Sequence, residues 1–135
     1  GEVFYVLEVV RGRFPFDALK RKVMEVKRRY PSAVLLIEDC PISRGLIQNL
    51  RDKSINVTVY KPDTDKRARV IAQTDLFAGG SVRFPRRATW LEDFIAELLG
   101  FPGRHDDQVD ALTQGLAWGR VRRGEVSASV LRRIY

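Results

Sequence analysis

Cysteine and histidine are almost absent from this sequence of 135 residues, since Cys40 and His105 are its single examples. One cysteine excludes an internal disulfide framework, and the two residues together are too few for a structural zinc site. Any bound metal must therefore be held mainly by carboxylates. Carboxylate oxygens favour a hard cation such as magnesium or manganese.

Long apolar runs are also missing. No stretch approaches the roughly 20 apolar residues that cross a bilayer, and the first residues lack the pattern of a signal peptide. We therefore expect no membrane segment and a cytoplasmic location. The sequence has no Gly-x-x-x-x-Gly-Lys-Ser/Thr phosphate loop, so ATP hydrolysis is not expected from this chain.

The charge is unbalanced, because 24 Lys and Arg against 17 Asp and Glu give a formal net charge of +7. An excess of positive charge favours a polyanionic partner, and nucleic acid is the leading candidate. Many soluble proteins are basic for solubility alone, so the net charge is supporting information only.

Hydrophobic periodicity predicts an α/β fold. We expect strands at 3–10, 33–37 and 55–60, a brief extended segment at 81–84, and helices at 16–30, 43–51, 65–77, from 91 onward, and 107–118. Thr89-x-x-Glu92 has the form of a capping box that opens the helix of Leu91. We expect one domain over residues 1–119, followed by a basic C-terminal tail over 120–135.

Glu38 and Asp39 stop the apolar run 33–37 abruptly, so they lie at the carboxyl end of a predicted strand. The segment 33–60 predicts a βαβ unit with parallel strands. Ligands gather outside the carboxyl ends of strands in open α/β sheets. Because adjacent strand residues face opposite ways, only one of the two acids should enter a site, and we favour Glu38.

Asp106, Asp107 and Asp110 cluster at the start of the last predicted helix. Acids in a first helical turn complement the helix dipole, and one of them could act as the N-cap. Three carboxylates within five residues exceed that need, because they repel one another unless a cation neutralises them. Both interpretations stay open. His105, next to the acids, is either incidental or a hydrogen-bonding partner for a phosphate or a water.

Glu38 could join these three aspartates in one crevice. Two cations about 4 Å apart, bridged by carboxylates, are the arrangement that hydrolyses phosphodiester bonds. The acidic residues therefore suggest a two-metal nuclease site.

Four segments resemble the C-terminal nuclease domain of phage terminase large subunits, which has the mixed sheet and flanking helices of ribonuclease H and the RuvC-type resolvases. The segments are Tyr5-Val6-Leu7-Glu8-Val9, Ile37-Glu38-Asp39 with Gly45-Leu46-Ile47-Gln48-Asn49-Leu50, Asp65-Lys66-Arg67-Ala68-Arg69, and Phe101-Pro102-x-x-His105-Asp106-Asp107-Gln108-Val109-Asp110-Ala111-Leu112. The last is the most specific.

The resemblance implies a magnesium- or manganese-dependent endonuclease that cuts concatemeric viral DNA during packaging in the host cytoplasm. It implies Glu38, Asp107 and Asp110 as metal ligands, with Asp106 auxiliary. It also implies that five residues contact double-stranded DNA: Lys61, Lys66, Arg67, Arg69 and His105. The implied protein partners are the terminase ATPase domain, the small terminase subunit and the portal.

The family also carries an Asp on a first central strand, which has no counterpart in this sequence. We therefore expect a sheet that lacks this strand. Three explanations stay open: a truncated piece, an incomplete site, or partial substitution by Glu8. Two alternative functions follow, a catalytically incomplete module that docks DNA or protein, and a nuclease that resolves Holliday junctions.

Overall fold

The computed structural model describes residues 3–62, 65–103, 107–121 and 128–133, with only the backbone described at 107, 121 and 128–133. The chain divides into two compact units. The first unit comprises Gly1–Gly12 and Thr64–Arg132, and the second comprises Arg13–Asp63 and Arg133–Tyr135. Each unit is described by itself below.

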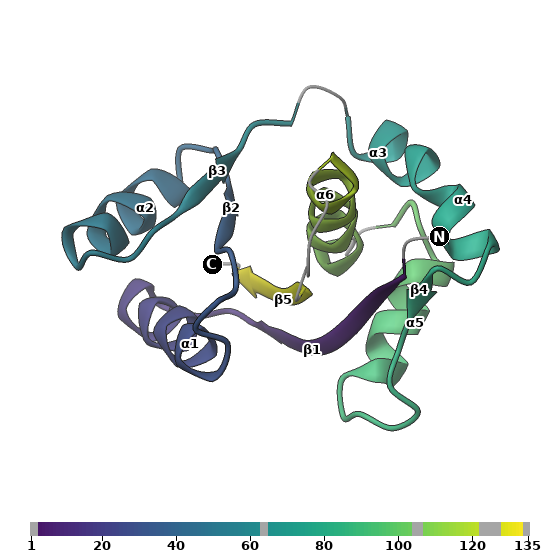
Figure 1. Ribbon diagram of the computed structural model, residues 1–135, viewed down its shortest axis with the longest axis horizontal. Coiled ribbons are helices and arrows are strands. Elements are labelled where there is room, and N and C mark those ends of the chain that lie inside the picture. The colour runs from purple at the N-terminus through teal and green to yellow at the C-terminus, as the bar shows by residue number, and fades with distance from the viewer. Residues whose placement is uncertain (1–2, 63–64, 104–106, 122–127, 134–135) are drawn as a thin grey trace. The chain divides into compact units, whose positions relative to one another are not determined.

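The sheet of the first unit is centred on β1 (Phe4–Gly12), as the β-branched and aromatic run predicts. β1 lies between β4 (Val82–Arg83) and β5 (Ala128–Arg133), as Figure 1 shows. The pairing of β1 with β4 is parallel and places Tyr5 opposite Arg83. The Arg83 guanidinium lies 6.0 Å from the centre of the Tyr5 ring.

One face of β1 is buried in the core of the first unit. The unit also contains α3 (Lys66–Ala72), α4 (Thr74–Ala78), α5 (Leu91–Leu99) and α6 (Asp107–Val121). Alternation along β1 buries Phe4 and Val6 and exposes Tyr5 and Leu7. The buried core residues are Phe4, Val6, Val9, Leu76, Val82, Phe94, Leu112 and Leu116.

Two local predictions in the first unit are wrong. The helix expected at 65–77 is two helices, because the chain breaks at Gln73, where the Thr74 hydroxyl donates to the Val70 carbonyl at 3.2 Å. Such a bond competes with the helical backbone ladder. Thr89 does not cap α5: the N-cap is Trp90, without a side-chain bond, so Thr89 and Glu92 are out of register for a capping box.

The second unit is the predicted βαβ unit preceded by a helix. It contains α1 (Phe16–Arg29), β2 (Leu36–Glu38), α2 (Ser43–Asp52) and β3 (Thr58–Tyr60) (Figure 1). β2 and β3 are parallel, as expected, and pair Glu38 with Tyr60. The buried apolar residues come from the two helices: Leu19, Val23, Leu46, Ile47 and Leu50.

Both expected strands of this βαβ unit are shorter than the apolar patterns predict, and begin at Leu36 and Thr58. None of the helices in the described part of the chain combines the length and apolarity that crossing a bilayer requires.

Candidate functional site

Glu38 is the last residue of β2, so it stands at the carboxyl end of a parallel strand as predicted. The chain turns immediately afterwards. The Ser43 hydroxyl donates to the Glu38 carbonyl at 2.6 Å, and the Asp39 N–H donates to the Tyr60 carbonyl at 2.8 Å. These bonds fix the backbone on which the half-buried Glu38 side chain is carried.

Asp39 has a partner of its own in the second unit. Its carboxylate lies 3.6 Å from Nε of Arg44, at the start of α2, and 30% of its side chain is exposed. An exposed pair at this distance stabilises little. Asp39 is thus paired with the first turn of α2.

The acidic segment of the first unit is described only in part. His105 and Asp106 lie outside the described residues, and Asp107 is described as the first residue of α6 without its side chain. The side chains of Gln108, Val109 and Asp110 are buried. Residues 108–110 of α6 therefore lie in the interior of the first unit.

A residue from a neighbouring helix caps α6. Glu97 of α5 accepts a hydrogen bond of 2.6 Å from the backbone N–H of Val109 and one of 3.1 Å from the Gln108 side chain. The first-turn N–H groups of a helix lack partners within that helix, and a carboxylate there also complements the helix dipole. Glu97 thus caps one of the first-turn N–H groups of α6, a role that the aspartates of this segment could otherwise have filled.

Asp110 is bound on both of its carboxylate oxygens. Arg69 of α3 donates to Oδ1 at 2.5 Å, and Gln114, one turn further along α6, donates to Oδ2 at 3.3 Å. Arg69 is 6% exposed and Asp110 is 1% exposed. The two residues form a buried ion pair, which breaks at a high cost when one partner is removed.

The basic residues expected at DNA differ in accessibility. Lys61 is exposed in the second unit, and Lys66 and Arg67 are exposed on α3. Arg69, on the same helix, faces inward to Asp110. Helical spacing contains only a partial signal for this: the apolar Leu76 follows Arg69 at i+7, but the residue at i+4 is the polar Gln73, where α3 has ended.

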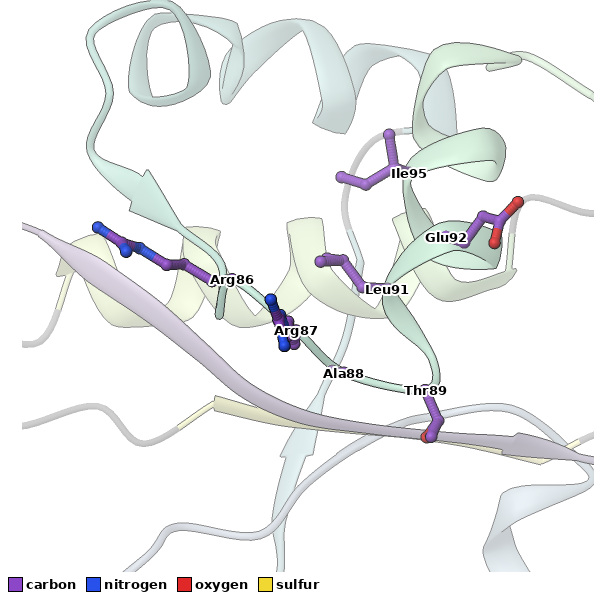
Figure 2. Close-up of a pocket in the computed structure, with 7 residues that line it drawn as sticks. All are labelled: Arg86, Arg87, Ala88, Thr89, Leu91, Glu92 and Ile95. Atoms are coloured by element: carbon purple, nitrogen blue, oxygen red, sulfur yellow. The ribbon is translucent and has the colours of Figure 1, made fainter.

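An open groove of about 760 Å³ lies at the start of α5. Leu91 and Ile95 extend from α5 toward it, and Arg86 and Arg87 come from the connection that follows β4 (Figure 2). Ala88, Thr89 and Glu92 complete the lining, so the groove contains none of the residues predicted for the acidic site.

The described residues do not by themselves form a metal centre. Among the described side chains, which do not include those of residues 104–107, no group of three or more His, Cys, Asp or Glu is arranged to hold a metal ion. Glu38 belongs to the second unit and Asp110 to the first. Glu8 is half-buried on β1, and Cys40 is half-buried after β2.

Comparison with known proteins agrees with the sequence resemblance. The family described as terminase RNaseH-like domain matches residues 1–117, a span that contains both Glu38 and Asp107. The match, with the mixed α/β architecture, confirms the predicted fold class and family resemblance. Neither a curated protein nor a solved structure gave a significant match.

Proposed function

The chain belongs to the terminase RNaseH-like domain family, and from this premise we propose that it is a metal-dependent DNA endonuclease that cuts concatemeric viral DNA during packaging. The family match carries the proposal, because it runs through the strand end at Glu38 and the acidic start of α6. Those segments hold the carboxylates that phosphodiester hydrolysis by this class of nuclease requires.

Donor chemistry supports a divalent cation at these residues. Glu38, Asp106 and Asp107 offer only carboxylate oxygens, which suit magnesium or manganese and do not suit softer metals. We propose Glu38 and Asp107 as ligands and Asp106 as an auxiliary acid. Asp110 fits such a site poorly as described, since its side chain is 1% exposed and its charge is already balanced by the buried Arg69 guanidinium.

A pair of cations, when bound, would supply a nucleophilic water and neutralise the charge of the leaving oxygen. The chain's own contribution is to place the carboxylates and to bind the DNA backbone. Three exposed basic residues would contact phosphates: Lys66 and Arg67 on α3, and Lys61 after β3. We propose the same role for His105, which directly precedes Asp106 in the sequence. Phosphate contacts give affinity without reading the base sequence.

Conversion of supercoiled plasmid to nicked circles in the presence of manganese tests the proposal. Wild-type protein should nick, and chelation should stop it. Glu38→Gln and Asp107→Asn should abolish nicking because each removes a ligand. Asp93→Asn is the matched control, since it removes an exposed carboxylate from α5 in the first unit. Equal nicking by all three variants would refute the assignment of Glu38 and Asp107 as metal ligands.

Manganese titration by calorimetry separates this function from a docking module. A chain that binds DNA in a salt-sensitive way, but neither binds manganese nor nicks, would be a nuclease-like scaffold. The motor domain, the small terminase subunit and the portal are the proposed partners of the assembled machine.

A further inference from the structure

The ion pair between Arg69 and Asp110 joins residues 41 positions apart in the chain, on α3 and α6. The Arg69 Nη2 atom lies 2.5 Å from Oδ1 of Asp110, and both side chains are almost completely removed from solvent. Charged side chains are seldom buried to this extent without a partner that balances them. The partner of the Asp110 charge here is a protein cation.

The surroundings of the Asp110 carboxylate reinforce this arrangement. Oδ2 accepts from the Gln114 side chain at 3.3 Å, and the Thr113 hydroxyl donates to the Asp110 carbonyl at 3.0 Å. Gln114 and Thr113 are themselves buried. A metal ion at this carboxylate would have to enter a closed region and compete with a guanidinium already in contact.

The same turn of α6 is held from a second direction. Glu97 of α5 accepts from the Val109 N–H, one residue before Asp110. The beginning of α6 is therefore tied to α3 through Asp110 and to α5 through Val109. Side chains that fix the orientation of a metal-binding segment affect metal affinity without touching the metal.

We propose that Asp110 is the buried anchor of α6 and not a metal ligand, and that Arg69 is a positioning residue that fixes, through Asp110, the turn that begins at Asp107. The anchor stands on the contacts within the first unit. Its consequence for catalysis rests on the function proposed above. Arg69 is accordingly assigned to the interior and not to the DNA surface.

A double-mutant cycle in the full 135-residue chain tests the anchor, with urea unfolding as the readout. Arg69→Gln leaves the Asp110 carboxylate buried without its cation, so its urea midpoint should fall furthest. Adding Asp110→Asn should raise the midpoint again, because the doubly neutral pair leaves no buried charge. If the effects of the single variants simply add, the anchor is refuted.

The matched control is the pair of Arg120 and Asp75, which joins α6 to α4 at 2.9 Å but is largely exposed. Arg120→Gln combined with Asp75→Asn should show far weaker coupling than the Arg69 and Asp110 cycle. If Arg69→Gln does not fold, Asp110→Asn is compared with the doubly neutral variant instead. The proposal requires the doubly neutral variant to fold, because that variant leaves no buried charge.

Manganese calorimetry on the same proteins then separates an anchor from a ligand. The variant with Arg69→Gln and Asp110→Asn should still bind manganese, with a loss of about 10- to 100-fold that is typical of a supporting residue, whereas Asp107→Asn should not bind it. A doubly neutral variant that folds but does not bind manganese would make Asp110 a ligand and overturn the proposal. Absence of binding by wild-type protein would instead refute the proposed function, with the urea cycle still deciding the anchor.

Discussion

The carboxylate of Glu97 on α5 caps the backbone N–H of Val109 in the first turn of α6, across a hydrogen bond of 2.6 Å. Helix caps are commonly supplied by the residue that precedes the helix, so a cap from another helix ties two elements together. The start of α6 is consequently fixed by tertiary contacts, and its own aspartates have less capping to do.

Glu97→Ala should lower the free energy of unfolding by about 1–2 kcal/mol, because it leaves a first-turn N–H without its acceptor. Urea unfolding measures this loss. Glu92→Ala is the control, since Glu92 is exposed on the same helix. A loss of the same size in both variants would mean that α5 helicity, and not the cap, was being measured.

Lys66→Ser combined with Arg67→Ser should weaken binding to a duplex of about 30 base pairs and lower the salt slope of the binding constant by about 2, because each phosphate contact releases roughly one counterion. Fluorescence anisotropy at several salt concentrations gives both values. Arg21→Ser with Arg28→Ser is the matched control on α1: each pair removes two positive charges, so the formal charge falls from +7 to +5 in both. Equal slopes in the two pairs would indicate binding by net charge alone.

Arg120 holds the pKa of Asp75 below its ordinary value of 3.8, by a direct side-chain hydrogen bond and by its charge. A carboxyl group with a lowered pKa in the folded state contributes stability above the unfolded value, and this contribution disappears as the pH falls through the folded pKa. In Arg120→Gln the pKa of Asp75 should return toward 3.8, as followed by carboxyl carbon NMR. An unchanged titration would exclude Arg120 as the cause.

Phe94 is the aromatic centre of the first unit, fully buried, with the rings of Phe84 and Trp90 centred 5.6 and 6.0 Å away. Phe94→Ala should cost about 3–5 kcal/mol of stability, because it removes a large side chain and leaves a cavity. Leu99→Ala, on the same helix but 80% exposed, should change stability by less than about 0.5 kcal/mol. Similar urea midpoints for the two variants would contradict this description of the core.

The long periodic segments of the fold could be predicted from the sequence. Leu19 and Val23 recur at helical spacing and are the buried residues of α1, and the alternation of Phe4 and Val6 sets the buried face of β1. The errors arose where short-range contacts compete. The hydroxyl of Thr74 interrupts one expected helix, and Trp90 takes the N-cap position that Thr89 was expected to hold.

The candidate site could be predicted less completely, because its contacts are distant in sequence. Periodicity says little about the direction of Arg69, because the helix breaks at Gln73, between Arg69 and the buried Leu76. It also cannot identify Asp110 as the partner of Arg69. Nor does any local pattern connect Glu97 to Val109, which lies twelve residues later on another helix. The sequence shows an unusual cluster of aspartates at residues 106–110, but only the structure identifies Arg69 and Gln114 as the partners of Asp110.

The separation of 41 residues between Arg69 and Asp110 also bears on the order of folding. Bringing two such distant residues together costs loop-closure entropy, so contacts of this kind form slowly compared with local helices. Both charges remain hydrated until that closure occurs. We therefore expect the contact between Arg69 and Asp110 to form after the local hydrogen bonds of α3 and α6, so that the first turn of α6 reaches its final position late in folding.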